Sequence, residues 1–193
     1  MKALRSNLQL FALPALLLGL APRVFLYDRT AIMHGEAWRL WTGHWVHFSA
    51  SHLAWNLVVL LGAGTWLEQA RPGLPGRFTL VGAPLISLGL LGLTPAMQAY
   101  GGLSGLATGV LVLLALVQLQ ARAAERGWWI GLLGLVAAKI LHDATHAGPL
   151  LSRFETGVHQ ASAAAHVLGA GLAAAAFLFH RSAMCRTPSF SAS

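Results

Sequence analysis

Long apolar runs constrain this chain more than any other feature of its sequence. Runs of about 17–25 apolar residues are long enough to cross a bilayer as helices. The 193 residues contain six such runs and little chain outside them, so we predict an all-α polytopic membrane bundle with six transmembrane helices. We expect one domain over residues 1–193, with 181–193 as a cytoplasmic tail. The predicted spans are residues 8–27, 48–67, 78–94, 104–121, 128–145 and 158–180.

The net charge of +7 raises the question of a nucleic-acid partner, which the distribution of the charges argues against. Basic residues do not form a patch interleaved with aromatic residues. They gather in the loops of one side, and such loops are cytoplasmic by the positive-inside rule. We therefore expect a lipid environment, no nucleic acid, and both termini in the cytoplasm. The cytoplasmic set is Lys2, Arg5, Arg71, Arg77, Arg122, Arg126, Arg181 and Arg186, against mainly Arg29, Arg39 and Arg153 outside.

The first run has a second interpretation as a signal peptide. Lys2 and Arg5 precede it, and Gly19-Leu20-Ala21 resembles a small-residue cleavage site. Pro22 would follow directly after the cut, where we expect it to hinder cleavage. We therefore treat the run as a retained span.

One serine stands at the start of the fourth run, among four glycines. The stretch is Tyr100-Gly101-Gly102-Leu103-Ser104-Gly105-Leu106-Ala107-Thr108-Gly109. Close packing of helices accounts for such glycines, since small residues let helices approach in lipid. A catalytic interpretation needs a base, because a hydroxyl is a weak nucleophile until its proton is removed. The best candidate is His166 in the sixth run.

His52 and Asn56 are four residues apart in the second run and share one face of its helix. Hydrogen bonding between helices, at about 0.6–2 kcal/mol, would account for them. The depth of His52 and Asn56 in the membrane instead favours a common site with Ser104 and His166. At about 1.5 Å per residue, all four lie roughly 18–27 Å from the cytoplasmic helix ends. With a hydrocarbon core of about 30 Å, they share the outer half of the membrane.

These four residues suit cleavage of a peptide bond. His166 would take the proton of Ser104 and return it to the leaving amine. The backbone N–H of Ser104 and the side chains of His52 and Asn56 would stabilise the oxyanion. No carboxylate is expected beside His166, so we predict a Ser-His dyad without a cofactor. Gly102 and Gly105 leave room for the substrate backbone, and Gly109 with Gly169 lets two helices touch.

Other interpretations remain open. His142-Asp143-Ala144-Thr145-His146 resembles the zinc motif H-E-x-x-H with aspartate in place of glutamate, which would make an intramembrane metalloprotease. Intramembrane histidines also occur in proton relays, so a transport or binding bundle is a further alternative. An inactive interaction protein is disfavoured by the intact Ser104 and His166. The external segment 148–157 and the outer end of the fifth span are expected to form a lid.

The motifs together resemble those of the rhomboid intramembrane serine proteases, over spans two to six. The resemblance implies a six-helix bundle and the roles given above for the serine, the base and the oxyanion pair. Gly43 departs from the family, in which many members have a histidine there. The matching segments are Gly102-Leu103-Ser104-Gly105 (G-x-S-G), Ala165-His166-Val167-Leu168-Gly169 (A-H-x-x-G), Trp38-Arg39, His52 with Asn56, and Glu68.

Within the rhomboids, the chain is most similar to the rhombosortase branch. The similarity rests on residues 38–44 (WRLWTGH), residues 100–105 (YGGLSG) and Lys139. It implies a bacterial inner-membrane protein with its active site toward the periplasm. Its substrates would be exported proteins carrying a C-terminal Gly-Gly segment, one apolar helix and a basic tail. The alternative is a general rhomboid protease that cleaves single-span proteins.

Overall fold

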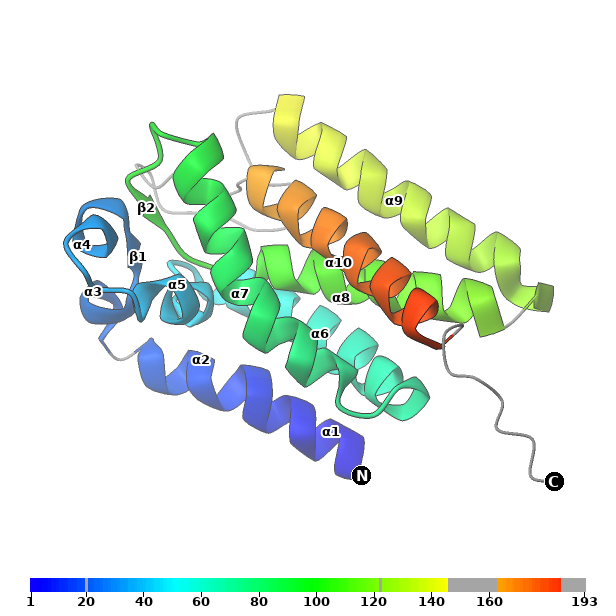
Figure 1. Ribbon diagram of the computed structural model, residues 1–193. Coiled ribbons are helices and arrows are strands. Elements are labelled where there is room, and N and C mark those ends of the chain that lie inside the picture. The colour runs from blue at the N-terminus through cyan, green and yellow to red at the C-terminus, as the bar shows by residue number, and fades with distance from the viewer. Residues whose placement is uncertain (20, 122, 146–162, 185–193) are drawn as a thin grey trace, which may run out of the picture.

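The computed structural model describes residues 1–19, 21–121, 123–145 and 163–184. Long helices run side by side through the molecule, and one end carries short helices and a two-stranded sheet (Figure 1). The predicted all-α class is therefore confirmed, apart from the two short strands.

Three helices in the described part of the chain are long and apolar enough to cross a membrane. They are α6 (Ala50–Ala70), α7 (Leu74–Leu93) and α8 (Ser104–Ala121). Of the apolar window of α8, 72% is buried by other parts of the protein, against 33% for α6 and 39% for α7. The helix that begins with Ser104 is therefore the central helix of the bundle.

Helices also occupy the other predicted spans, although the count of six spans remains a prediction. The fifth corresponds to α9 (Arg126–Thr145), which follows the short helix η3 (Ala123–Glu125), and the sixth to α10 (Ala163–Met184). The first is interrupted. It consists of α1 (Lys2–Asn7), the π-helical turn η1 (Leu8–Ala12) and α2 (Leu13–Leu18), and a separate helix α3 (Pro22–Phe25) follows. Pro22 begins that helix because proline suits the first helical turn.

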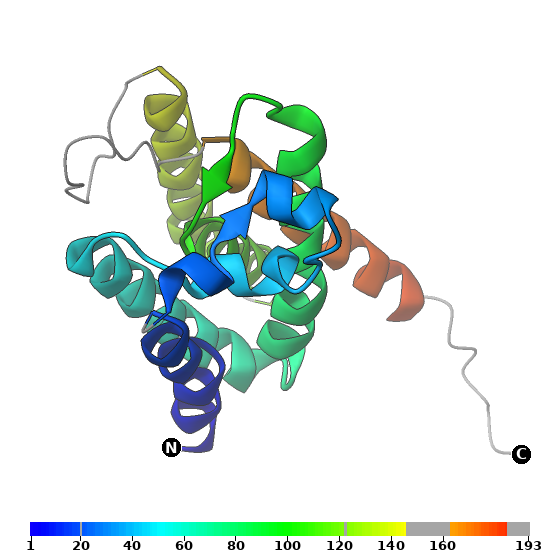
Figure 2. The same cartoon turned by 90° about the vertical axis from the view of Figure 1, so that its left-hand side faces the viewer.

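The short elements at one end form the first inter-helix segment, which Figure 2 views face-on. They are β1 (Tyr27–Asp28), α4 (Arg29–Met33), α5 (Arg39–Thr42) and η2 (Gly43–Trp45). Buried Arg39 fastens them together. Its guanidinium donates to Glu36 Oε2 at 2.6 Å and to the carbonyl oxygen of Leu26 at 2.7 Å. Arg39 of the Trp38-Arg39 pair is thus part of the framework at this end.

A two-stranded antiparallel sheet joins this segment to the loop that leads into α8. Strand β2 (Ala99–Tyr100) pairs with β1, with Tyr27 opposite Tyr100. The rings of these two tyrosines meet edge to face with centroids 6.3 Å apart. The sheet therefore fixes the position of the chain four residues before Ser104.

A backbone carbonyl in α7 that lacks its partner within the helix is bonded by the first inter-helix segment. Pro84 lies inside α7 and has no N–H to donate to the carbonyl of Leu80. The indole Nε1 of Trp41 donates to that carbonyl instead, at 3.0 Å. At the opposite end, Glu68 accepts from the backbone N–H of Gly73 and closes the α6–α7 turn.

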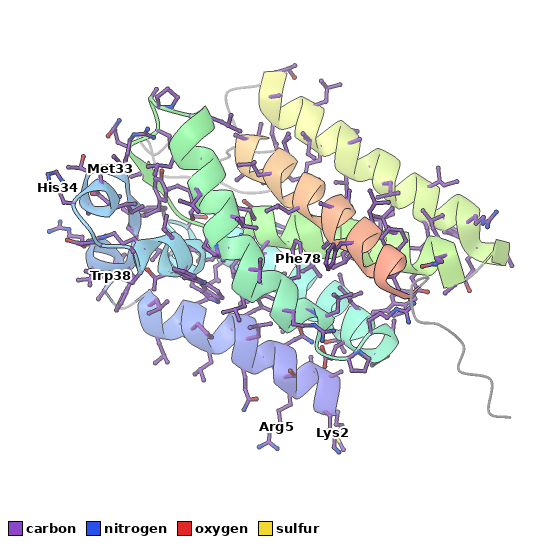
Figure 3. All side chains as sticks on the ribbon, in the orientation of Figure 1. Lys2, Arg5, Met33, His34, Trp38 and Phe78 are labelled. Atoms are coloured by element: carbon purple, nitrogen blue, oxygen red, sulfur yellow. The ribbon has the colours of Figure 1, made fainter. Side chains whose placement is uncertain are left out.

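The two ends of the bundle also differ in the side chains they present. Lys2 and Arg5 project near the N-terminus, whereas Met33, His34 and Trp38 lie at the end with the sheet (Figure 3). The last described turn of α10 lies at the same end as the N-terminus (Figure 1). This arrangement agrees with the basic-loop pattern of the sequence.

Candidate active site

The loop before Ser104 has a backbone that only glycine suits. Gly102 has φ +133°, and a Cβ atom placed on it would lie 2.6 Å from Cε1 of His52. The hydroxyl of Tyr100 donates to the carbonyl oxygen of Gly102 at 2.8 Å. Glycine therefore allows the imidazole of His52 to pack directly against the chain two residues before Ser104.

Tyr100 is also a neighbour of the serine side chain, a role that the sequence analysis did not assign. Burial raises the pKa of Tyr100 to about 12, although hydrogen bonding with the Ser104 side chain and the Gly105 backbone lowers it in part. The phenol therefore stays protonated at neutral pH and lies beside the Ser104 hydroxyl. The signal in the sequence was an aromatic residue with a hydroxyl four positions before the serine.

Helices α8 and α10 approach each other backbone to backbone beside Ser104 and His166. A Cβ atom on Gly105 would lie 2.9 Å from the carbonyl oxygen of Ala165. One on Gly109 would lie 2.9 Å from the carbonyl oxygen of Gly169. Ser104 precedes Gly105, and His166 follows Ala165, so the two residues adjoin this contact.

His166 is 2% exposed, and its two ring nitrogens have different surroundings. Nδ1 lies 2.9 Å from Oδ2 of Asp143, although the oxygen lies off the direction of the ring N–H. Nε2 has no hydrogen-bond partner within the described residues. A buried polar atom without a partner is uncommon in proteins, so Nε2 is available to a group that the resting structure does not supply.

The contact with Asp143 corrects the expectation that no carboxylate lies beside His166. From the sequence, Asp143 was considered only as the counterpart of the glutamate in the zinc motif of residues 142–146. In the structure this side chain is fully buried, and α9 packs against α10. This contact results from the packing of α9 against α10, so no local sequence pattern could have revealed it.

His52 and Asn56 lie on α6, both 6% exposed, and a third histidine joins them. Nδ1 of His47 lies 2.9 Å from the carbonyl oxygen of Trp45, so Nδ1 is the protonated nitrogen. Nε2 of His47 then accepts from the backbone N–H of Leu103 at 3.3 Å and from the amide of Asn56 at 3.2 Å. His47 thus links Asn56 to the residue before Ser104.

The family model for the Rhomboid domain matches residues 34–182. The chain belongs to the rhomboid family. That family consists of intramembrane serine proteases, which act on membrane proteins within the bilayer, so the predicted family and membrane setting are confirmed. No curated protein shows a significant match to this rhomboid.

Gly43, the departure from the family pattern, has a structural reason in this rhomboid. A Cβ atom on Gly43 would lie 2.6 Å from the backbone nitrogen of Tyr27, on strand β1. The carbonyl oxygen of Gly43 also accepts from the N–H of Gly102, at 3.4 Å. A histidine at 43 would push the sheet away, and the ring of neighbouring His44 packs against Tyr100 instead.

The described part of this rhomboid gives little support to the metalloprotease alternative. His142 lies 3.7 Å from Asp143, through Nδ1 and Oδ1, and His146 lies outside the described residues. Across the described ranges, no group of three or more histidine, cysteine, aspartate or glutamate side chains could hold a metal ion. Segment 148–157 of the predicted lid also lies outside the described residues.

Proposed function

We propose that this rhomboid is an intramembrane serine endopeptidase in which Ser104 is the nucleophile and His166 the base. The observation that carries this proposal is the close contact of α8 with α10. It sets Ser104 and His166 at adjoining positions and leaves Nε2 of His166 buried without a partner in the described structure. A buried imidazole nitrogen beside a serine is suited to removing the hydroxyl proton.

The reaction proceeds by acyl transfer. Nε2 of His166 takes the Ser104 proton as Oγ bonds to the scissile carbonyl carbon, and the same proton then passes to the leaving amine. The negative charge on the carbonyl oxygen is stabilised by the Ser104 N–H, His52 and Asn56. Water then enters and hydrolyses the acyl-enzyme, which restores the free serine.

In the resting structure the Ser104 side chain lies beside the phenol of Tyr100. Catalytic hydrogen bonds are often absent or long before substrate binds. Substrate binding would therefore accompany a turn of the hydroxyl from Tyr100 toward His166. Gly102 and Gly105 offer the approaching peptide no obstructing side chain.

Cleavage of a membrane-anchored reporter by the purified protein in proteoliposomes tests this proposal. Ser104→Ala and His166→Ala are expected to abolish cleavage, because each removes half of one chemical unit. Ser6→Ala and His34→Ala are matched controls at exposed positions away from the site, and should cleave as the wild type does. Substantial cleavage by Ser104→Ala would refute the serine mechanism.

The substrates we infer are exported proteins with a C-terminal Gly-Gly segment, one apolar helix and a basic tail. A helix must unwind before its peptide bonds can be attacked, and each glycine weakens a helix by about 1 kcal/mol relative to alanine. A basic tail holds the substrate with its C-terminus in the cytoplasm. That orientation brings the Gly-Gly segment to the periplasmic side of the inner membrane, where we place Ser104.

Substitution in the substrate separates this specificity from that of a general rhomboid protease. A reporter with the Gly-Gly tail should be cut, and the same reporter with Leu-Leu should resist. Equal cleavage of both, or preference for generic single-span substrates, would overturn the rhombosortase-like specificity. Such a result would leave the serine mechanism standing.

A further inference from the structure

Asp143 is the only buried acidic side chain in the described part of the chain. It lies in the last turn of α9, and its side chain has no exposed surface. Burial of a carboxylate is costly unless it is paired and hydrogen-bonded. Its Oδ2 atom has two partners, Nζ of Lys139 at 2.5 Å and Nδ1 of His166 at 2.9 Å.

The position of Asp143 does not serve the stability of α9. A negative charge in the last turn of a helix opposes the helix dipole. The pair with Lys139 also has the basic residue four positions before the acidic one, the less favourable order on a helix. An ion pair that served only the helix would have no need to reach a histidine of α10.

The contact with His166 has a chemical consequence. A carboxylate at Nδ1 holds the proton on that nitrogen, so Nε2 keeps the lone pair that a general base requires. Nε2 has no polar partner within the described residues, whereas Nδ1 has Oδ2 of Asp143 at 2.9 Å, off the direction of the ring N–H. A carboxylate thus lies beside Nδ1, and Nε2 is left without a partner in the described structure. A histidine that acts as a base on a serine requires this arrangement.

We propose that Asp143 is a positioning residue that orients His166 and fixes its tautomer, and that Lys139 keeps Asp143 ionised. The site then contains a Ser104, His166 and Asp143 triad in place of a dyad. Lys139 is half-buried, with 35% of its side chain exposed, so its charge is only partly desolvated. This inference rests on the serine protease mechanism proposed above and adds a third residue to it.

The first test is the steady-state kinetics of Asp143→Asn in proteoliposomes. We expect kcat to fall by at least about tenfold, and up to the roughly 10⁴-fold seen when a triad aspartate becomes asparagine, with KM nearly unchanged. Asp143→Glu should recover part of the loss. Asp28→Asn is the matched control, since Asp28 caps α4 and asparagine can also cap.

The double variant Lys139→Met/Asp143→Asn distinguishes positioning from a structural ion pair. It removes both charges, so a purely structural pair would recover its activity together with its thermal stability. A positioning role predicts that stability recovers while kcat remains low. Recovery of kcat in the double variant would overturn the inference.

A spectroscopic measurement on the wild type covers the case in which Asp143 variants do not fold. The ¹⁵N shifts of labelled histidine report which ring nitrogen carries the proton, and His166→Gln identifies the signal of His166. The inference predicts a proton on Nδ1 of His166. A proton on Nε2, or Asp143→Asn kinetics equal to those of Asp28→Asn, would refute it. Loss of activity in Ser104→Ala would still support the serine mechanism.

Discussion

Gly169 of α10 lies so close to Gly105 of α8 that a methyl group on Gly169 would overlap the carbonyl oxygen of Gly105. This contact holds together the two helices that carry the candidate nucleophile and base. Any side chain at residue 169 must push α10 away from α8 and separate His166 from Ser104.

Gly169→Ala should therefore reduce kcat by at least tenfold and destabilise the protein by about 1–3 kcal/mol, as overpacking does. Gly171→Ala is the matched control on the same helix, because a Cβ atom there would meet no atom within 4 Å. Reporter cleavage and thermal unfolding in detergent measure the two effects. Equal activity of the two variants would show that the close contact is dispensable.

Loss of one oxyanion donor should lower kcat more than it weakens substrate binding. We expect His52→Ala and Asn56→Ala each to reduce kcat by about 10²–10³ with little change in KM. Initial rates over a range of substrate densities in proteoliposomes separate the two constants. A variant that changes only KM would assign that residue to substrate contact or packing.

The thermal stability of the protein should fall with acidification between about pH 6.5 and pH 4. Burial lowers the pKa of His47 to about 4, and that of buried His44 also to about 4. Since the unfolded histidines titrate near the ordinary value of about 6.5, the unfolded chain binds more protons in this interval. The contribution of these histidines to stability is therefore fully present above about pH 6.5 and declines below it.

Unfolding temperatures recorded from pH 4 to pH 8 test this. His47→Gln should show a shallower decline than the wild type, because one of the histidines with a lowered pKa is then absent. An unchanged decline would show that His47 does not contribute to it.

Chelators should leave cleavage intact, because the proposed mechanism uses only protein groups. Reporter cleavage after treatment with EDTA, with and without added zinc, measures this. Loss of activity with EDTA and recovery with zinc would favour the metalloprotease alternative that uses His142 and His146.

Hydropathy located the long helices well, because a membrane segment must be both apolar and long enough to cross the bilayer. The predicted runs 48–67, 78–94 and 104–121 correspond to α6, α7 and α8, with ends shifted by a few residues or fewer. In the first run, 8–27, the long helix ends at Leu18 and the separate short helix α3 follows. Hydropathy measures composition and does not register such breaks.

The candidate site was partly predictable, because helix spacing and depth bring Ser104, His166, His52 and Asn56 toward one level. The residues that contact these four could not be predicted. Asp143 contacts His166 through packing of α9 against α10, and His47 reaches Asn56 from an irregular segment. Neither contact follows from periodicity, since both depend on how separate segments pack in three dimensions.

The proposed serine mechanism depends above all on an activated hydroxyl at Ser104. A fluorophosphonate probe reacts only with a serine whose proton is removed by a nearby base. Treatment of the purified protein in membranes, followed by mass spectrometry of its peptides, locates the label. We expect one label, on Ser104, which is lost in Ser104→Ala and forms much more slowly in His166→Ala. A wild-type protein that remains unlabelled while cleaving its substrate, or that is labelled equally in His166→Ala, would contradict this mechanism.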